Sequence, residues 1–368
     1  MTSDHSVPAG ADSAPIIGSA EEITVEWLSA ALGTEVTAVA VAPVGTGQLG
    51  TGLLVDVTTA EGRGAEEADV PARLFVKLPT ADVGMRPLVH GVYRAEVVFY
   101  RDLAPTLAIR APRCHYAAIG DEGTGEFTLV LDDAAPRVQG DQLAGLTPAQ
   151  ALDCAVNLAG LHGPRWCDPT LDAIPGLPRP SAEDNAALDE MAGPTVEAFL
   201  AELGHRLSDE ERAVCAELPS LVGRWANGRR ERFAPIHQDF RADNMLVAPS
   251  GDLPSLAVDF QTMTIGLPGR DLAFLLSTSL SPEDRRAHED AIVAAYHEAL
   301  LGHGVTDYDL DTCRDDYVYG LLQGPVIGTF GWLYGSRTER GDDMFVTMMR
   351  GAARAIADHD ALDVVRRG

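Results

Sequence analysis

Apolar residues in the first third of this chain gather in short runs rich in Val and Leu, which Gly, Pro and charged residues separate. Runs of this length and composition are typical of β-strands. We therefore expect strands in residues 36–41, 53–59, 71–78 and 127–131. Residues 93–100 instead repeat their apolar positions at helical spacing, and residues 24–32 predict a short helix that ends near Gly33.

Beyond residue 136 the pattern predicts mostly helix. The stretch Thr147–Gln150 combines an N-cap threonine, a proline at the first helical position and a glutamine where a capping box needs it. Ser208 and Ser281 begin similar stretches, each with acidic residues in the first turn. One hairpin interrupts the helices, with strands in residues 245–247 and 256–258 around a Pro-Ser-Gly-Asp turn.

Oxygen-bearing side chains flank this hairpin. Asp239 lies in the loop before it, Asn244 directly precedes the first strand and Asp259 directly follows the second. Since a hairpin brings the start of its first strand beside the end of its second, Asn244 and Asp259 are expected at one end. Their oxygens suit a hard cation such as Mg²⁺. The spacing indicates a phosphoryl-transfer site; an acidic hairpin with solvated carboxylates is the alternative.

With these residues the chain resembles the aminoglycoside phosphotransferase and choline kinase family, and it is similar to the ecdysteroid-kinase-like subgroup. The catalytic segments carry the resemblance, which extends in order and spacing from Trp27 to the C-terminal helices. It implies an α+β fold, a bilobal protein-kinase-like architecture with an antiparallel-sheet N-lobe and a mostly helical C-lobe. We expect a disordered segment in residues 1–20, a nucleotide-binding N-lobe in residues 21–133, and a catalytic and substrate-binding C-lobe in residues 134–368.

Lys77 is the only lysine among the 368 residues. A compact ammonium can reach between two phosphates, which a bulkier forked guanidinium cannot do in the same way. The resemblance implies that Lys77 grips the α- and β-phosphates of ATP and pairs with Glu96 on the next helix. The alternative is a lysine that stands on a surface strand by chance.

Gly45, Gly47 and Gly50 match a G-x-G-x-x-G pattern. A dinucleotide-binding fold requires a helix after these glycines, but residues 53–59 are rich in β-branched side chains and favour a strand. Strand, glycine turn and strand is the kinase-type arrangement, in which backbone N–H groups cover the phosphates. An ordinary glycine-rich hairpin turn is the alternative.

The resemblance also assigns roles within the site. Asp239 accepts the hydroxyl proton of the substrate and aims its oxygen at the γ-phosphorus of ATP, while Asn244 and Asp259 bind Mg²⁺. In the hinge between the lobes, the carbonyl of Asp132 and the N–H of Ala134 hold the adenine.

Arg241, two residues after Asp239, has two possible roles. It could stabilise charge on the transferring phosphoryl group as a catalytic residue, or it could form a salt bridge with Asp243 or Asp271. Asp271 is expected to accept backbone N–H groups of the catalytic loop, as its family counterpart does, and His237 to brace that loop by hydrogen bonds. For His162 we expect a buried structural role rather than a catalytic one.

The composition limits the kinds of binding partner that the protein can have. A formal net charge of −27 argues against nucleic acid and against an anionic membrane surface. Five scattered cysteines without metal-site spacing, and an N-terminus without an apolar segment, indicate a cytoplasmic protein. No apolar run reaches membrane-spanning length. The partner is therefore expected to be a small hydroxyl compound, whose identity the sequence leaves open together with the oligomeric state.

Three functions remain open at this level. The first is an ATP-dependent O-phosphotransferase that acts on a small molecule. The second is a pseudokinase-like scaffold that binds nucleotide without turnover, and the third is a dinucleotide-dependent oxidoreductase that rests on the glycines alone. Four aromatic residues line the substrate pocket or belong to the helical core, namely Tyr317, Tyr319, Trp332 and Tyr334.

Overall fold

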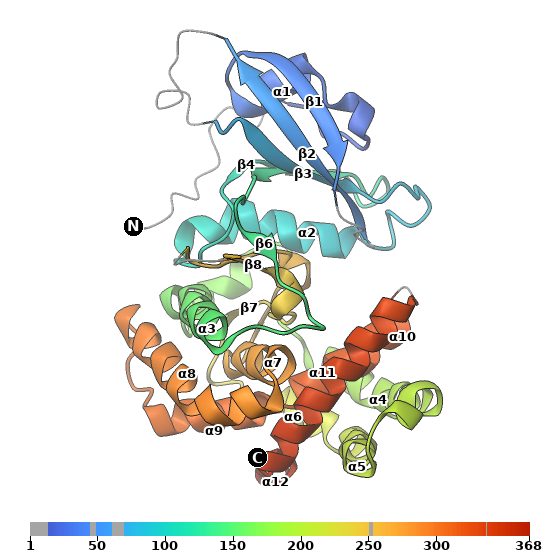
Figure 1. Ribbon diagram of the computed structural model, residues 1–368, viewed down its shortest axis with the longest axis vertical. Coiled ribbons are helices and arrows are strands. Elements are labelled where there is room, and N and C mark those ends of the chain that lie inside the picture. Colours follow the sequence, from blue (N-terminus) through green and yellow to red (C-terminus); the bar gives the residue numbers. More distant parts are fainter. Residues whose placement is uncertain (1–13, 45–48, 61–69, 250–252, 336) are drawn as a thin grey trace. The chain divides into compact units, whose positions relative to one another are not determined.

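The computed structural model describes residues 14–44, 49–60, 70–249, 253–335 and 337–368. The chain divides into two units, and Figure 1 labels most of their helices and strands. The first unit comprises Met1–Thr106, Ala111–Ala135 and Asp259–Thr262. The second comprises Leu107–Arg110, Pro136–Val258 and Met263–Gly368. A short piece of chain from residue 259 to 262 thus belongs to the unit formed mainly by the N-terminal third.

An antiparallel sheet forms the centre of the first unit (Figure 1). Its strands are β1 (Val36–Pro43), β2 (Gly50–Thr59), β3 (Arg73–Pro79), β4 (Cys114–Ile119) and β5 (Phe127–Asp132). Their order in the sheet is β1-β2-β3-β5-β4. The four strands expected from the apolar runs are confirmed, and β4 is an additional strand that pairs with β5.

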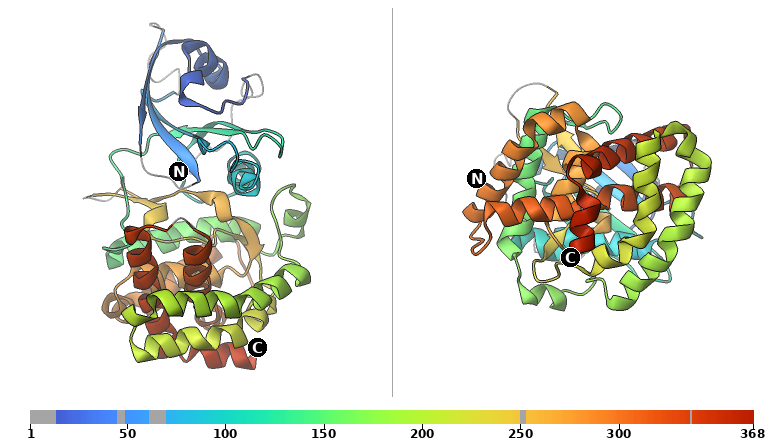
Figure 2. Two further views of the ribbon diagram at one scale, coloured as in Figure 1. Left: turned by 90° about the vertical axis from the view of Figure 1, so that its right-hand side faces the viewer. Right: turned by 90° about the horizontal axis from the view of Figure 1, so that it is seen from below.

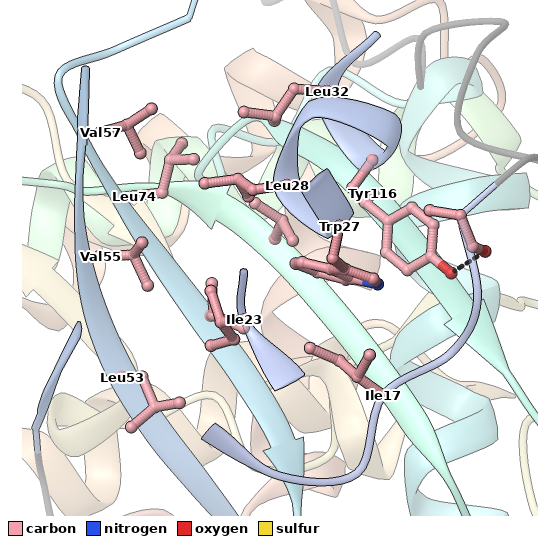
Figure 3. Close-up of a cluster of buried hydrophobic side chains, with 14 of the residues drawn as sticks. Ile17, Ile23, Trp27, Leu28, Leu32, Leu53, Val55, Val57, Leu74 and Tyr116 are labelled. Atoms are coloured by element: carbon pink, nitrogen blue, oxygen red, sulfur yellow. Dashed lines mark hydrogen bonds between the residues drawn. The ribbon is translucent and has the colours of Figure 1, made fainter. Parts of the chain in front are cut away.

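Helix α1 (Val25–Leu32) packs on this sheet and closes a hydrophobic core (Figure 3). The side chain of Thr24 accepts a hydrogen bond from the N–H of Trp27, and Gly33 ends the helix in the left-handed region at φ 63°. Trp27 and Tyr116 meet edge to face in this core, with ring centroids 5.8 Å apart. The short helix predicted from the sequence is therefore confirmed.

The expectation of disorder over residues 1–20 is wrong for residues 14–20. Ile17 is 3% exposed in the core, and its N–H and carbonyl both bond to Thr128 Oγ1 at 3.0 Å. Ala14 is buried as well, and its carbonyl accepts a hydrogen bond from the Tyr116 hydroxyl. The Ser-, Ala- and Gly-rich composition suggested that the loss of conformational entropy would keep this segment disordered, but these contacts offset that loss. Residues 1–13 lie outside the described residues.

Helix α2 (His90–Val98) follows β3 and continues into a π-helical turn, η3 (Phe99–Leu103). The remaining short helical turns of this unit are η2 (Ala20–Glu22), η4 (Ala104–Thr106) and η10 (Phe260–Thr262). Phe99 stacks on Phe260 with ring centroids 3.4 Å apart. This stacking fixes the 259–262 segment against the helix that carries Glu96.

The second unit is largely helical (Figure 2). Its α-helices are α3 (Pro148–His162), α4 (Ala182–Leu203), α5 (Asp209–Glu217), α6 (Val222–Asn227), α7 (Gly269–Ser279), α8 (Pro282–Gly302), α9 (Leu310–Gly320), α10 (Gln323–Tyr334), α11 (Glu339–Asp358) and α12 (Ala361–Arg367). Its short 3₁₀ turns are η5 (Gly163–Arg165), η6 (Pro169–Ala173), η7 (Gly204–Arg206), η8 (Leu218–Ser220) and η9 (Ala242–Asn244). Capping boxes at Thr147 and Ser208, and an N-cap at Ser281, confirm the three predicted helix starts.

Two small sheets carry the loops of the second unit. Strands β7 (Ala234–Ile236) and β10 (Thr264–Gly266) form one, and β6 (Val138–Gln139), β8 (Met245–Val247) and β9 (Leu256–Ala257) form the other. Met245 pairs with Ala257 and Leu246 with Leu256, so the predicted hairpin is confirmed. The tip of its turn, residues 250–252, lies outside the described residues.

The C-terminal aromatic residues belong mainly to the helical core. Tyr317, Tyr319 and Trp332 are buried, whereas Tyr334 is 64% exposed. Trp332 donates its indole N–H to Asp342 at 3.0 Å. Within the described ranges, no helix combines the length and the apolar composition that a membrane crossing would need.

Candidate functional site

Three charged side chains of the first unit form a cluster, called here the charge cluster: Lys77 on β3, Glu96 on α2 and Asp259 at the start of the 259–262 segment. Lys77 Nζ lies 2.7 Å from Glu96 Oε2 and 2.9 Å from Asp259 Oδ1. The Glu96 side chain is 3% exposed, the Lys77 side chain 18% and the Asp259 side chain 30%. The cluster is thus buried on the Glu96 side and open to solvent on the Asp259 side.

The neighbouring carboxylates keep the Lys77 side chain in its charged ammonium form. Burial acts to lower the pKa of the Lys77 ammonium, but the charges of Glu96 and Asp259 outweigh it and raise that pKa well above its usual range. Burial raises the pKa of Glu96, which the Lys77 ammonium opposes and the charge of Asp259 reinforces. One ammonium therefore serves two carboxylates, and a further anion nearby would compete for it.

The first residues of β2 lie directly beside Lys77. Gly52 is the antiparallel partner of Lys77, and Gly50 is the partner of Pro79. A Cβ on Gly50 would lie 3.0 Å from the Leu78 carbonyl oxygen, a tighter approach than most side chains make, so this position favours glycine. Gly45 and Gly47 of the same pattern lie outside the described residues.

The predicted hinge residues lie at the end of β5. Asp132 is the last residue of the strand, and His115 Nε2 on β4 lies 2.6 Å from its Oδ1. The Asp132 N–H donates to the Arg113 carbonyl at 2.9 Å. Ala134 follows two residues later, just before the chain enters the second unit at Pro136. The adenine-binding role of Asp132 and Ala134 stays a prediction.

In the second unit the loop from His237 to Asn244, called here the Asp239 loop, fixes the Asp239 carboxylate. Asn244 Nδ2 donates to Asp239 Oδ2 and to the Asp239 carbonyl, both at 2.8 Å. Arg241 Nε donates to the other carboxylate oxygen at 2.9 Å. The Asp239 side chain is 23% exposed, so the carboxylate is held in place yet remains accessible.

Arg241 joins two carboxylates of this loop. Besides Asp239 it contacts Asp243, with Nη1 2.9 Å from Asp243 Oδ2. Burial acts to lower the pKa of Arg241, but the charges of Asp239 and Asp243 outweigh it and raise the pKa. Asp243 also accepts a hydrogen bond from the N–H of Gln142 at 2.8 Å. Of the two salt-bridge partners considered from the sequence, the structure thus has Asp243.

Asp271 holds the Asp239 loop by hydrogen bonds to its backbone. Its carboxylate is fully buried and accepts the backbone N–H groups of His237 at 2.6 Å and Gln238 at 2.8 Å. His162 Nε2 lies 3.3 Å from the same carboxylate, and its Nδ1 lies 2.7 Å from the Tyr296 hydroxyl. Burial lowers the pKa of His162. The expectations for Asp271 and for a buried, hydrogen-bonded His162 are both confirmed.

His237 ties the loop to the end of the hairpin. Its Nε2 lies 3.0 Å from the Val258 carbonyl, while its Nδ1 accepts the Asp239 N–H at 3.3 Å. The Val258 N–H donates to the Asn244 carbonyl at 3.0 Å. Val258 is the residue before Asp259, which has a left-handed backbone at φ 67°. A non-glycine residue in that region is costly and concentrates at functional sites.

Comparison with known proteins identifies the architecture. Choline kinase from Cryptosporidium parvum is similar at 11% identity over 93% of this chain and 93% of its own, with a TM-score of 0.55. Ethanolamine kinase from Plasmodium vivax is similar at 11% identity over 86% of this chain and 83% of its own, with a TM-score of 0.51. A variant of aminoglycoside 2'-phosphotransferase-IIIa, solved as its GDP complex, is similar at 16% identity over 92% of this chain and 94% of its own, with a TM-score of 0.51.

This chain has the protein-kinase-like fold. The sheet of the first unit and the helices of the second unit confirm the α+β fold class expected from the sequence. A family model described as "Uncharacterized oxidoreductase dhs-27" matches residues 230–321, which include the Asp239 loop, Asp259 and Asp271. No curated protein matches the sequence significantly.

Within this kinase-like fold, several supporting residues carried no recognisable signal in the sequence. Tyr93 donates its hydroxyl to the Leu49 carbonyl at 2.6 Å and thereby ties the end of the glycine segment to α2. Gln323 on α10 donates to the Gln238 carbonyl at 2.8 Å, and Gln142 bonds to Asp243. Each acts across more than 40 positions of sequence, so only the folded chain reveals its partner.

Proposed function

We propose that this protein is an ATP-dependent O-phosphotransferase that moves the γ-phosphoryl group of ATP to a hydroxyl of a small molecule. The observation that carries the proposal is the pairing of the only lysine, Lys77, with the buried Glu96 at 2.7 Å. An ammonium held in this way by a carboxylate is the device that grips the α- and β-phosphates in kinase-like folds. Its raised pKa keeps the charge that this role needs.

Asp239 is the acceptor of the hydroxyl proton in this proposal. Its carboxylate is oriented by Asn244 and Arg241, so it can aim the substrate oxygen without reorganising. The single guanidinium of Arg241 already pairs with both Asp239 and Asp243, which supports a positioning role for it rather than direct contact with the phosphoryl group. Phosphoryl transfer depends mainly on such positioning.

The donor groups of Asn244 and Asp259 fit Mg²⁺. Because Asn244 Nδ2 is committed to Asp239, its Oδ1 is left as an acceptor for a cation. Asp259 accepts from Lys77 through Oδ1 and from Gln261 through Oδ2 at 3.2 Å, and a carboxylate has lone pairs for a metal besides these. When bound, Mg²⁺ would neutralise charge on the phosphates.

A small acceptor is supported by the short connection between Asp259 and Asp271. Only eleven residues separate them, whereas protein kinases use a longer segment here to dock peptides. The structurally similar proteins are named as choline kinase, ethanolamine kinase and an aminoglycoside phosphotransferase, and the last was solved with GDP. A cytoplasmic location is part of the same proposal, since all five cysteines are free thiols.

The oxidoreductase alternative lacks structural support. A dinucleotide site would need a helix after the glycines, but Gly50–Thr59 forms strand β2. The family model with an oxidoreductase in its description covers residues 230–321 and therefore does not include the glycine segment.

The test is to incubate the protein with γ-labelled ATP, Mg²⁺ and a cell lysate divided by molecular-weight cutoff. Label should enter the small-molecule fraction with the wild-type protein and not with Asp239→Asn. Mg-ATP binding without any Asp239-dependent transfer would establish the scaffold instead. Label confined to proteins would contradict a small-molecule acceptor.

A further inference from the structure

Tyr100 lies beside the charge cluster but takes no part in it. It belongs to the π-helical turn η3, four residues after Glu96, and is 1% exposed. Its ring meets Phe260, the residue after Asp259, edge to face at 5.9 Å between centroids. The same turn buries both Phe99 and Tyr100, which are consecutive. The wider π-helical turn, a feature frequent at functional sites, thus brings a phenol next to the segments that carry both carboxylates.

The Tyr100 hydroxyl has no hydrogen-bond partner among the described residues. This contrasts with Tyr116 in the same unit, whose hydroxyl donates to the Ala14 carbonyl at 3.0 Å. Leaving a buried polar group unsatisfied is costly, so a persistent instance calls for an explanation. Burial, followed by the charge of Glu96, raises the pKa of Tyr100 well above its usual range. The hydroxyl therefore stays protonated and remains a donor close to a carboxylate.

Glu96 is the more deeply buried of the two carboxylates in the cluster. It is 3% exposed and is held by Lys77 Nζ through Oε2, while the same ammonium also serves Asp259. An ammonium has three N–H donors. Once two phosphate oxygens take two of them, one N–H remains for Glu96, and Glu96 shares the charge of the ammonium with the phosphates. A buried carboxylate with weakened pairing is unfavourable unless another donor is supplied.

We propose that the Tyr100 hydroxyl donates to the Glu96 carboxylate when nucleotide phosphates engage Lys77, and so acts as a positioning residue of the nucleotide-bound state. The inference rests on the proposed function, because it requires phosphates at Lys77. Positions four apart on a helical segment are neighbours on one face, which puts Tyr100 on the side of the segment that carries Glu96. The unsatisfied hydroxyl then destabilises the nucleotide-free state, and nucleotide binding removes this destabilisation.

The variant Tyr100→Phe removes this hydroxyl and keeps the ring. We expect the dissociation constant for the Mg²⁺ complex of β,γ-imido-ATP, measured by calorimetric titration, to rise about tenfold. The Tm without nucleotide should be unchanged or higher, since a buried unpaired group is lost. The matched control is Tyr116→Phe, which removes a satisfied hydroxyl of the same unit: its Tm should fall while its affinity for the nucleotide stays the same.

A third variant tests the named partner. In a Glu96→Gln background, Tyr100→Phe should change the nucleotide affinity by less than about twofold, because the charge that the hydroxyl serves is gone. Wild-type affinity in Tyr100→Phe, or an equal effect of Tyr100→Phe with and without Glu96, would overturn the inference alone. A wild-type protein that does not bind the Mg²⁺–nucleotide complex would overturn the proposed function, and this inference with it.

Discussion

The amide of Asn244 holds Asp239 by two hydrogen bonds, one to the carboxylate and one to the backbone carbonyl, each 2.8 Å long. One side chain therefore fixes both the conformation of the loop and the direction of the carboxylate. The same bonds set the orientation of the Asn244 amide and leave its oxygen for a cation. The positioning of the Asp239 carboxylate and the predicted cation binding by Asn244 therefore depend on the same hydrogen bonds.

Substituting Asp239 and Asp259 should separate catalysis from binding. Asp239→Asn should lower turnover by at least about 100-fold, because the amide cannot accept the hydroxyl proton, and leave Mg-ATP affinity nearly unchanged. Asp259→Asn should also weaken Mg-dependent nucleotide binding, since it loses a metal-binding charge. Initial rates and calorimetric titration measure the two effects. Near-normal turnover in both variants would show that the site is wrongly assigned.

Labelling should identify Lys77 as the phosphate-binding group. An acyl-phosphate analogue of ATP should acylate Lys77, and excess Mg-ATP should block the reaction. Because Lys77 is the only lysine, mass spectrometry assigns the product without ambiguity apart from the N-terminal amine, which serves as the internal control. Lys77→Arg should lower turnover while the Tm stays close to that of the wild type. Labelling of Lys77 that Mg-ATP fails to block would contradict the role.

Asp271→Asn should destabilise the protein strongly. Asp271 is fully buried and accepts the N–H groups of His237 and Gln238 with its two oxygens. In asparagine one of these oxygens becomes an NH₂ that faces a donor, so a cost of about 3 kcal/mol and a Tm lower by several degrees are expected. Asp290→Asn, at a side chain 92% exposed, is the control and should leave the Tm unchanged. Equal Tm values for the two variants would refute the bracing role.

The stability of the protein should depend on pH through the ionisation of Glu289. Burial acts to raise its pKa, but hydrogen bonds from His359, Tyr317 and Arg285 lower it from 4.5 to about 2. A depressed pKa means that the stabilisation is complete above about pH 4.5 and is lost as the pH falls toward 2. Its magnitude is roughly 3 kcal/mol.

Thermal unfolding of Glu289→Gln measures this effect. The variant should have a lower Tm than the wild type at pH 7, and the difference should shrink as the pH is lowered below about 4.5. Glu298→Gln, at an exposed position of the same helix, makes the same chemical change and should show no such trend. A Tm difference that stays constant down to acidic pH would rule out the ionised, hydrogen-bonded state of Glu289.

Local features of this protein could be predicted from the sequence because they depend on residues that are close together along the chain. The hairpin of residues 245–257 follows from two apolar runs around a turn, and it delivers Asn244 and Val258 to one end. The capping box at Thr147 needs only the glutamine three residues later. Lys77 and Glu96, 19 positions apart, were paired by resemblance to a family and not by any local pattern.

Tertiary structure alone decided which polar groups meet. The sequence left Arg241 between a catalytic role and two salt-bridge partners. Its contacts to Asp239 and Asp243 span two residues each, but the loop conformation that allows them is held by Asp271, more than 30 positions away. Composition suggested that residues 14–20 are disordered, yet contacts with Thr128, 111 positions from Ile17, order them. Gln323 and Tyr100 gave no signal, because a glutamine or tyrosine in a helix has no preferred distant partner. Such contacts form only when the chain closes long loops and buries the groups together, and their free energy comes from that shared burial rather than from local propensity.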